Sequence, residues 1–313
     1  MHQCLKLKIS TLKVMKMNKV MCPICETYDN STLIHKANFD KKSFSKEIFS
    51  ARRLPDRRYF QWVRCNSCGL LRSDPVMPLN LEVLYKDSEF NYSNELDGLK
   101  KTYLNIIKKA LRKNWLKNSV FEIGGGNGFF LEAAKDAGFK VISGVEPSKD
   151  AVDKARPDVL PFMIIGMMNQ NSLPQDSFDV GVMFHVMDHL KSPINILIDC
   201  RYALNCGGTL IVAVHNEKSW SARLFGSKSP IIDVEHTFLF NKKTAKKLFE
   251  KAGYVDIKFG SYSNHYSLRY LVQLFPFFRK HRERILSSRF GSYLGNFKVI
   301  IPLGNMWVSG SKP

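Results

Sequence analysis

Two pairs of cysteines have the spacing of metal-binding knuckles. The first pair is Cys22 and Cys25, and the second is Cys65 and Cys68, which Gly69 follows. In such a knuckle both sulfurs reach one ion from a tight turn, and a glycine after the second cysteine accepts the positive φ of the turn. Two knuckles supply four thiolates, which fill a tetrahedral zinc site and leave no position for water. We therefore expect a structural Zn²⁺ ion bound by these four cysteines.

The spacer between the two knuckles is long. The 39 residues between Cys25 and Cys65 exceed the spacer of about 15–20 residues that is usual at such sites, which predicts a strand-rich insertion. Cys200 and Cys206 are expected on a helix and at its end, as core residues. Lysines interrupt the apolar residues before Met21, so we expect no signal peptide and a cytoplasmic protein with reduced thiols.

A glycine-rich loop follows the apolar run that begins at Ser119. Residues Glu122–Gly128 read Glu-Ile-Gly-Gly-Gly-Asn-Gly, and such glycines let the backbone pass close to a bound nucleotide. The dinucleotide fingerprint G-x-G-x-x-G is excluded in the frame of Gly124, because its third glycine position holds Phe129. Glu146 ends the next predicted strand, where a carboxylate can accept both hydroxyls of a ribose. Loop and carboxylate together favour a nucleotide site over a purely structural turn.

The elements that must position these residues alternate between strand and helix, which predicts a parallel sheet with helical crossovers. The expected strands are Ser119–Ile123, Lys140–Val145, Pro161–Gly166, Phe178–Phe184 and Gly208–Val214.

Capping signals predict the helices. One helix is expected to begin at Ser192-Pro193 and to end at Gly207, and another to run from Asn241 to Gly253. The apolar face of the first would consist of Ile194, Leu197, Ile198 and Tyr202. Ahead of the sheet, the residues from Leu96 to Leu111 keep helical spacing.

The glycine loop resembles the E/D-x-G-x-G-x-G motif of class I S-adenosylmethionine-dependent methyltransferases. Other segments resemble that family's entry to its fourth strand, its hvlEH segment with Asp188 in place of Glu, the turn into its fifth strand and its reversed last strand. In this chain they are Leu173–Val180, Phe184–His189, Asn205–Leu210 and Val299–Lys312. The resemblance implies an α/β, Rossmann-like seven-stranded sheet with a small N-terminal zinc-binding ribbon, and S-adenosyl-L-methionine as cofactor.

By the family's pattern, one set of residues is expected to bind the cofactor. It comprises Glu122, Gly124, Gly125, Gly126, Gly128, Glu146, Met168 and His185. Met168 follows the third predicted strand and would pack on the adenine, although a plain core role is an equal alternative.

Two further segments, Phe49–Asp56 and Cys68–Pro75, resemble a subgroup with a zinc ribbon whose members are tied to sugar and polysaccharide modification. Within it, Ile232–Phe240 resembles the Y-x-E-H-F-F-L-F segment of sugar C-methyltransferases, whose histidine is the base. The resemblance implies His236 as general base.

Two further residues are expected to assist that base. Glu235 would orient His236 or raise its basicity, and His189 would be a second group on the acceptor side; a neutral histidine suits proton removal near pH 7. Asp233 stands where the subgroup has tyrosine, so the acceptor or proton route differs. The alternative for His236 is a cap or turn residue.

Four segments are expected along the chain: a tail over 1–20, a zinc-binding module over 21–78, a helical connector over 79–116 and the methyltransferase domain over 117–313. Met1, Met17 and Met21 remain alternative starts. Residues Arg269 to Ser288 read as an apolar half followed by a basic half. This segment is either a lid or surface for lipid-linked sugar phosphates, or a helix packed on the sheet.

Charge indicates an anionic partner. The net charge of +19 divides into +11 for residues 1–116, −3 for 117–216 and +11 for 217–313, so the basic flanks suit a phosphorylated acceptor, nucleic acid or a membrane surface. No apolar run approaches the length of about 18 residues that a membrane span needs. Peripheral contact with the inner face of a membrane stays open.

The leading hypothesis is methyl transfer to a small-molecule acceptor, a nucleotide- or lipid-linked sugar, at carbon or oxygen. The first alternative is an rRNA or tRNA base methyltransferase, although the N-P-P-Y type motif is absent where Phe184-His185 stands. The second is a non-catalytic S-adenosylmethionine-binding scaffold. Acceptor, methylated atom and oligomeric state do not follow from the sequence.

Overall fold

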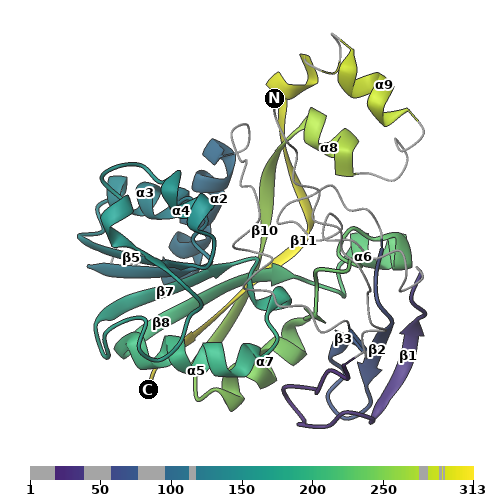
Figure 1. Cartoon of the computed structure of the whole chain (residues 1–313), viewed down its shortest axis with the longest axis horizontal. Helices are drawn as coiled ribbons and strands as arrows, with labels where there is room; N and C mark the ends of the chain where they lie inside the picture. Colours follow the sequence, from purple (N-terminus) through teal and green to yellow (C-terminus); the bar gives the residue numbers. More distant parts are fainter. Residues whose placement is uncertain are drawn as a thin grey trace, which may run out of the picture.

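The computed structural model describes residues 18–38, 58–76, 96–112, 118–274, 281–288, 291 and 293–313. Its centre is a seven-stranded sheet in the order β6-β5-β4-β7-β8-β11-β10 (Figure 1). The strands from β4 to β8 in this sheet pair in parallel, and β11 is antiparallel to both of its neighbours. The strands span β4 Ser119–Ile123, β5 Val141–Glu146, β6 Met163–Ile165, β7 Phe178–Phe184, β8 Leu204–His215, β10 Val255–Ser267 and β11 Lys298–Ser311. The expected class I fold is confirmed.

Helices cover both faces of this sheet (Figure 1). One face carries α2 Leu96–Leu111, α3 Phe129–Asp136 and α4 Lys149–Asp153, and the other carries α5 Pro193–Ala203 and α7 Lys242–Lys251. Shorter helices are α6 Trp220–Phe225, α8 Leu268–Leu274 and α9 Arg282–Ser287, with 3-10 turns η4 Leu160–Phe162, η5 Met187–His189, η6 Gly226–Lys228 and η8 Leu294–Asn296.

The described residues 18–38 and 58–76 form an N-terminal module that shares its sheet with the larger domain. Strands β1 Ser31–His35, β2 Trp62–Cys65 and β3 Leu71–Ser73 continue into β9 Phe238–Leu239, which comes from the other end of the chain. Their antiparallel order is β1-β2-β3-β9. Apolar residues of the module also join the core beneath α5 and α7. The module is therefore built into the larger domain. Of the strand-rich insertion predicted between the knuckles, the described residues contain β1 and most of β2, and residues 39–57 lie outside the described part.

The connection between α5 and β8 differs from the predicted one. The helix ends at Ala203, β8 begins at Leu204, and Gly207 lies within the strand with a φ of 72°. The main chain of Gly207 donates to the carbonyl of Lys312, because β11 pairs alongside. Gly207 is thus no helix end, and Cys206 is an exposed strand residue rather than a core residue, whereas Cys200 is buried.

The face that α5 buries also differs from the predicted stripe. Pro193, Leu197, Cys200 and Ala203 are buried, while Ile198 is 42% exposed. By contrast α7 behaves as expected: Asn241 forms a capping box, and Gly253 follows the helix with positive φ.

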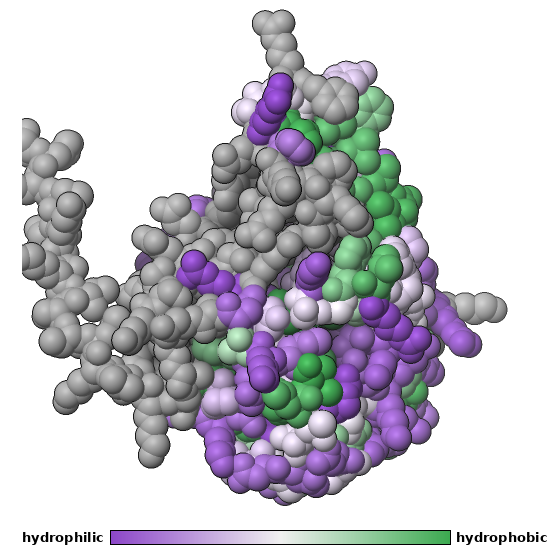
Figure 2. All heavy atoms as spheres, turned by 90° about the vertical axis from the view of Figure 1, so that its right-hand side faces the viewer, coloured by the Kyte–Doolittle hydropathy of each residue, from purple (hydrophilic) through white to green (hydrophobic). Residues whose placement is uncertain are grey.

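The described parts of the segment predicted as a lid or lipid surface are α8 and α9, on the C-terminal hairpin. Strands β10 and β11 extend beyond the main sheet and carry α8 and α9 at their far end (Figure 1). Figure 2 shows apolar residues gathered at the level of this hairpin, above a lower half of the molecule that is mostly hydrophilic. The helices within the described residues are too short or too polar to cross a membrane. The lid and the lipid surface stay predictions. Phe49–Asp56 and Met17 lie outside the described residues.

Candidate functional site

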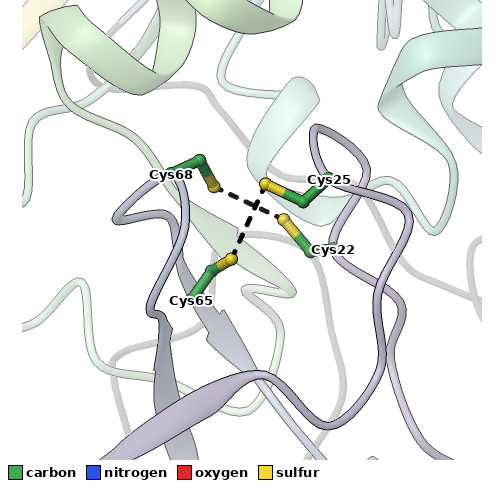
Figure 3. Close-up of side chains that lie close together, drawn as sticks. All are labelled: Cys22, Cys25, Cys65 and Cys68. Carbon is green, nitrogen blue, oxygen red and sulfur yellow. Dashed lines mark hydrogen bonds between the residues drawn. The ribbon is translucent and has the colours of Figure 1, made fainter.

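The four predicted zinc ligands lie together, and we call Cys22, Cys25, Cys65 and Cys68 the thiol cluster (Figure 3). Their sulfurs cross in two pairs, with 3.5 Å between Cys22 and Cys68 and 3.8 Å between Cys65 and Cys25. Tetrahedral zinc with bonds of about 2.3 Å places its sulfurs about 3.8 Å apart. The thiol cluster therefore has the donor set and the dimensions of a Cys₄ zinc site.

The two knuckles repeat one backbone geometry. The amide of Glu26 donates to the carbonyl of Cys22, and the amide of Gly69 donates to that of Cys65. Both Glu26 and Gly69 have positive φ, 56° and 83°, so the role expected of the glycine is confirmed and Glu26 fills it in the first knuckle. The amide of Leu70 points to the sulfur of Cys68 at 3.5 Å, which favours its thiolate form.

The glycine-rich loop lies between β4 and α3 at the carboxyl ends of the parallel strands. Gly124, Gly126 and Gly128 have positive φ of 72°, 55° and 71°. A Cβ atom on Gly124 would meet Cγ2 of Val186 at 2.4 Å. Glycine is therefore required at position 124 and favoured at 126 and 128, and the loop keeps its backbone open to a ligand at the switch point between β4 and β7.

Glu146 ends β5 beside this loop. Its two carboxylate oxygens accept hydrogen bonds from the amides of Gly126 and Ser148, both at 2.9 Å. Burial raises the pKa of Glu146, and these two amides oppose that effect. Each oxygen has a second lone pair, so the carboxylate fits a ribose diol while it also holds the loop.

Glu122 and Met168, which were also expected to bind the cofactor, are both buried. Glu122 is buried beneath Gly125, whose Cβ position lies 3.3 Å from Oε2 of Glu122. Met168 is buried among core residues on the α5 side, which agrees with the plain core alternative as well as with adenine packing. The binding roles of these residues stay predictions.

Four histidines gather beyond the carboxyl ends of β7 and β8, and we call His185, His189, His215 and His236 the histidine cluster. Ring centroids lie 4.7 Å apart for His185 and His215, 4.6 Å for His189 and His236, and 5.2 Å for His215 and His236. The four residues come from the end of β7, from η5, from the end of β8 and from the segment before β9. The tertiary fold thus brings together His236, His189 and His185, which the sequence had singled out separately.

Hydrogen bonds orient three of these rings. Nε2 of His185 lies 2.7 Å from the hydroxyl of Tyr262, and Nδ1 of His215 lies 2.9 Å from Oδ1 of Asn305. Nδ1 of His189 donates to the carbonyl of Glu235 at 3.1 Å. His185 also has a positive φ of 56°, an uncommon conformation that clusters at functional sites.

Burial lowers the pKa of two imidazoles of the cluster, those of His236 and His189. Burial lowers the pKa of His236 well below 6.5, and the charges of His189, His215 and His185 lower it further. Burial likewise lowers the pKa of His189, although Asp188 opposes this. A neutral imidazole can accept a proton.

Main-chain contacts link the N-terminal module to this cluster. The amide of Ser73 donates to the carbonyl of Thr237 at 2.9 Å, and the amide of Thr237 donates to the carbonyl of Asp188 at 2.8 Å. The residue after His236 is therefore held between β3 and η5. The module that carries the thiols helps to position the candidate base.

Sequence reasoning missed four residues that the structure places around the cluster: Asp188, His215, Tyr262 and Asn305. Asp188 was noted only as a departure from the family pattern. Tyr262 and Asn305 lie on β10 and β11, whose contribution depends on antiparallel pairing and has no local signal.

A cavity of about 200 Å³ lies between the N-terminal module and the segment that follows β8. Its charged lining consists of the cations Arg64, Lys218 and Arg223 and the carboxylate Glu217. Glu217 accepts two hydrogen bonds from Arg64, at 3.2 and 3.1 Å. The lining is net positive, which suits an anionic group.

Comparisons with known proteins agree with this geometry. A family model described as a methyltransferase domain matches residues 97–258, just over half of the chain. Curated relatives include tRNA U34 carboxymethyltransferases from Shewanella amazonensis, 28% identical over 100 residues, and from Shewanella baltica, 29% identical over 141 residues. The first alignment covers 30% of each protein, and the second covers 43% of this chain and 40% of the relative.

Solved structures with a similar fold include a SAM-dependent methyltransferase, a possible histamine N-methyltransferase, from Thermotoga maritima. It is 20% identical with a TM-score of 0.48, covering 70% of this chain and 91% of that one. A putative methyltransferase in complex with the Haloferax volcanii Trm112 activator is 18% identical with a TM-score of 0.49, covering 70% and 92%. Because the family model spans more than half of the sequence, the chain belongs to the methyltransferase-domain family.

Proposed function

We propose that this protein transfers a methyl group from S-adenosyl-L-methionine to a small-molecule acceptor, a nucleotide- or lipid-linked sugar. The observation that carries the proposal is the position of the histidine cluster beyond the carboxyl ends of β7 and β8, next to the glycine loop on β4. Ligands of open α/β sheets bind at this edge. The glycine loop and the histidines that could accept a proton therefore face the same region.

The residues at the glycine loop fit the cofactor. Glu146 would accept its ribose hydroxyls, the backbone of Gly124 and Gly126 would approach it closely, and Met168 and His185 would line its pocket. Bound there, S-adenosylmethionine supplies a methyl group on a positively charged sulfur. Glu122 would fix the loop from below, since it lies under Gly125.

His236 is proposed as the general base. It is nearly buried, and its Nδ1 atom makes no hydrogen bond to the described residues, so this nitrogen is the one that would take the proton of a bound acceptor. Glu235 would position the base through the turn that it shares with Asp233, whose carboxylate accepts from the Glu235 amide. His189, with Nδ1 committed to the Glu235 carbonyl, would present Nε2 to the acceptor.

The positive cavity favours an acceptor that carries phosphate. Arg223 and Lys218 line it together with Ile232, which lies four residues before His236. A diphosphate held there would leave the attached sugar within reach of the base. A lipid-linked acceptor would bring the protein to the inner face of a membrane.

We also propose that the thiol cluster binds a structural Zn²⁺ ion. Four sulfurs at tetrahedral spacing leave no coordination position for a substrate. Its contribution would be to hold β3 against β9, and so to hold the segment that carries His236.

The test is a radiolabelled-methyl assay with the purified chain against nucleotide sugars, polysaccharide precursors and total RNA. We expect label in a sugar acceptor. His236→Ala should lower turnover by about 100-fold or more while cofactor affinity stays near wild type, and the exposed His281→Ala variant is the matched control. Equal loss of turnover and affinity would make His236 structural.

A tRNA acceptor is the second candidate, because the curated relatives act on tRNA U34 by name. Label in RNA alone would overturn the sugar proposal and establish this alternative. Cofactor binding without transfer to any acceptor would instead identify a non-catalytic scaffold.

A further inference from the structure

We infer that His185, Asp188 and His215 form a binding site for a divalent transition-metal ion, separate from the thiol cluster. One ligand atom from each residue lies within 4.8 Å of the others. Two imidazoles and one carboxylate are a donor set for zinc and iron(II), and the remaining positions of such an ion stay open to water or substrate.

Asp188 supplies the main physical argument. Its side chain is fully buried, and neither carboxylate oxygen has a hydrogen-bond partner among the described residues. A buried carboxylate without partners is costly, and buried charges are ordinarily paired or coordinated to a metal. A cation between Asp188 and the two histidines would bind one of these oxygens and neutralise the charge of the carboxylate.

The surroundings of the site match the outer shell of a metal centre. Metal-binding histidines commonly use their other ring nitrogen in a hydrogen bond that fixes tautomer and orientation. Nδ1 of His215 is held by Asn305, which leaves Nε2 as the ligand atom, and Nε2 of His185 contacts Tyr262. A tetrahedral ion with bonds of about 2.1 Å needs donors about 3.4 Å apart, which small side-chain rotations would achieve.

The position of the ion gives it a role that rests on the proposed function. His236 adjoins His215, with ring centroids 5.2 Å apart. An ion that takes an acceptor oxygen as a ligand lowers the pKa of that hydroxyl. The lowered pKa of the hydroxyl would compensate for the weak basicity that burial gives His236.

Metal content tests the site without reference to activity. The full chain, purified with and without added Zn²⁺, is analysed by mass spectrometry for bound metal. We expect two equivalents in the wild type and one in both His215→Ala and Asp188→Asn, with the thiol cluster still loaded. His281→Ala should keep two. One equivalent in the wild type under both conditions would overturn the second site.

Cobalt(II) separates the two sites by spectrum. The thiol cluster gives intense thiolate-to-metal charge-transfer bands, whereas a site of two histidines and one aspartate gives only ligand-field bands. We expect the second equivalent of Co²⁺ to add ligand-field absorption alone, and this addition to be absent from His215→Ala. A second equivalent that adds thiolate bands, or that persists in that variant, would contradict the proposal.

The His236→Ala variant separates this inference from the proposed function. It should keep both metal equivalents while it loses turnover. Loss of the second equivalent would make His236 a ligand and overturn its role as base, and a metal-replete chain without methyl transfer would overturn the proposed function alone.

Discussion

The thiol cluster and the histidine cluster are both made of metal-binding residue types, but they are assembled differently. Each half of the thiol cluster lies within four consecutive residues, and its four ligands are chemically alike. The histidine cluster draws on four separate segments, and its rings are held by Tyr262, Asn305 and the carbonyl of Glu235. A set of identical ligands in local turns serves the fold, whereas a mixed set at the sheet edge is suited to chemistry.

Removal of one thiol should have the largest effect on the N-terminal module. Cys65→Ser should abolish zinc binding and unfold the N-terminal module, because structural zinc contributes about 10 kcal/mol or more to such folds. Metal analysis and thermal unfolding measure the effect. Cys206→Ser is the control, since that thiol is exposed and remote from the cluster; equal zinc content in the two variants would rule out the proposed ligand set.

The next change tests the module without touching its thiols. Arg72 is fully buried and donates to the carbonyls of Val20 and Tyr28 and to the carboxylate of Asp74, at 2.8, 2.6 and 3.2 Å. Arg72→Met should lower the free energy of unfolding by about 3–5 kcal/mol, because it leaves Asp74 unpaired. Urea unfolding measures the difference.

A surface ion pair of the same module is the control for that variant. Lys19 and Asp29 are 60% and 77% exposed, so Lys19→Met should leave the free energy of unfolding nearly unchanged, because solvent screens the pair. If Arg72→Met and Lys19→Met have the same free energy of unfolding, the buried arginine does not stabilise the module.

Substitution of Asp188, which lies beside the histidine cluster, should change the free energy of unfolding in the opposite direction. Asp188→Asn should raise the unfolding free energy of the metal-free protein by about 1–3 kcal/mol, because it removes an unpartnered buried carboxylate. Denaturant unfolding in the presence of a chelator is the measurement. The exposed Asp256→Asn variant should show no change. A clear loss of stability in Asp188→Asn would mean that this carboxylate serves the fold, as the cysteines do.

The smallest effect concerns the hydrogen bond between Tyr262 and His185. Tyr262→Phe removes one bond worth about 0.5–1.5 kcal/mol, so turnover should fall by about 2- to 10-fold while the melting temperature stays within a few degrees. Tyr293→Phe is the control, since Tyr293 is 58% exposed. An unchanged rate would show that Tyr262 does not orient the ring.

Much of the fold could be predicted because its signals are local. The strand Phe178–Phe184 and the caps at Asn241 and Gly253 follow from residue type and spacing. The helix end at Gly207 was wrong because Leu204 already pairs with Phe178 of β7, and β11 pairs with the strand from Thr209 onward, so β8 begins directly after the helix. Pairing with neighbouring strands outweighed the local preference of a glycine, because strand formation depends strongly on tertiary context.

Sequence alone determined the two knuckles, the glycine loop, Glu146 and the class of fold, because each depends on residues close together in the chain or on a regular alternation of elements. Tertiary structure decided that His236 meets His189 and His215, that β3 pairs with β9, and that Asp188 is buried without a partner among the described residues. These contacts join segments tens of residues apart through sheet order and packing, for which no local pattern exists.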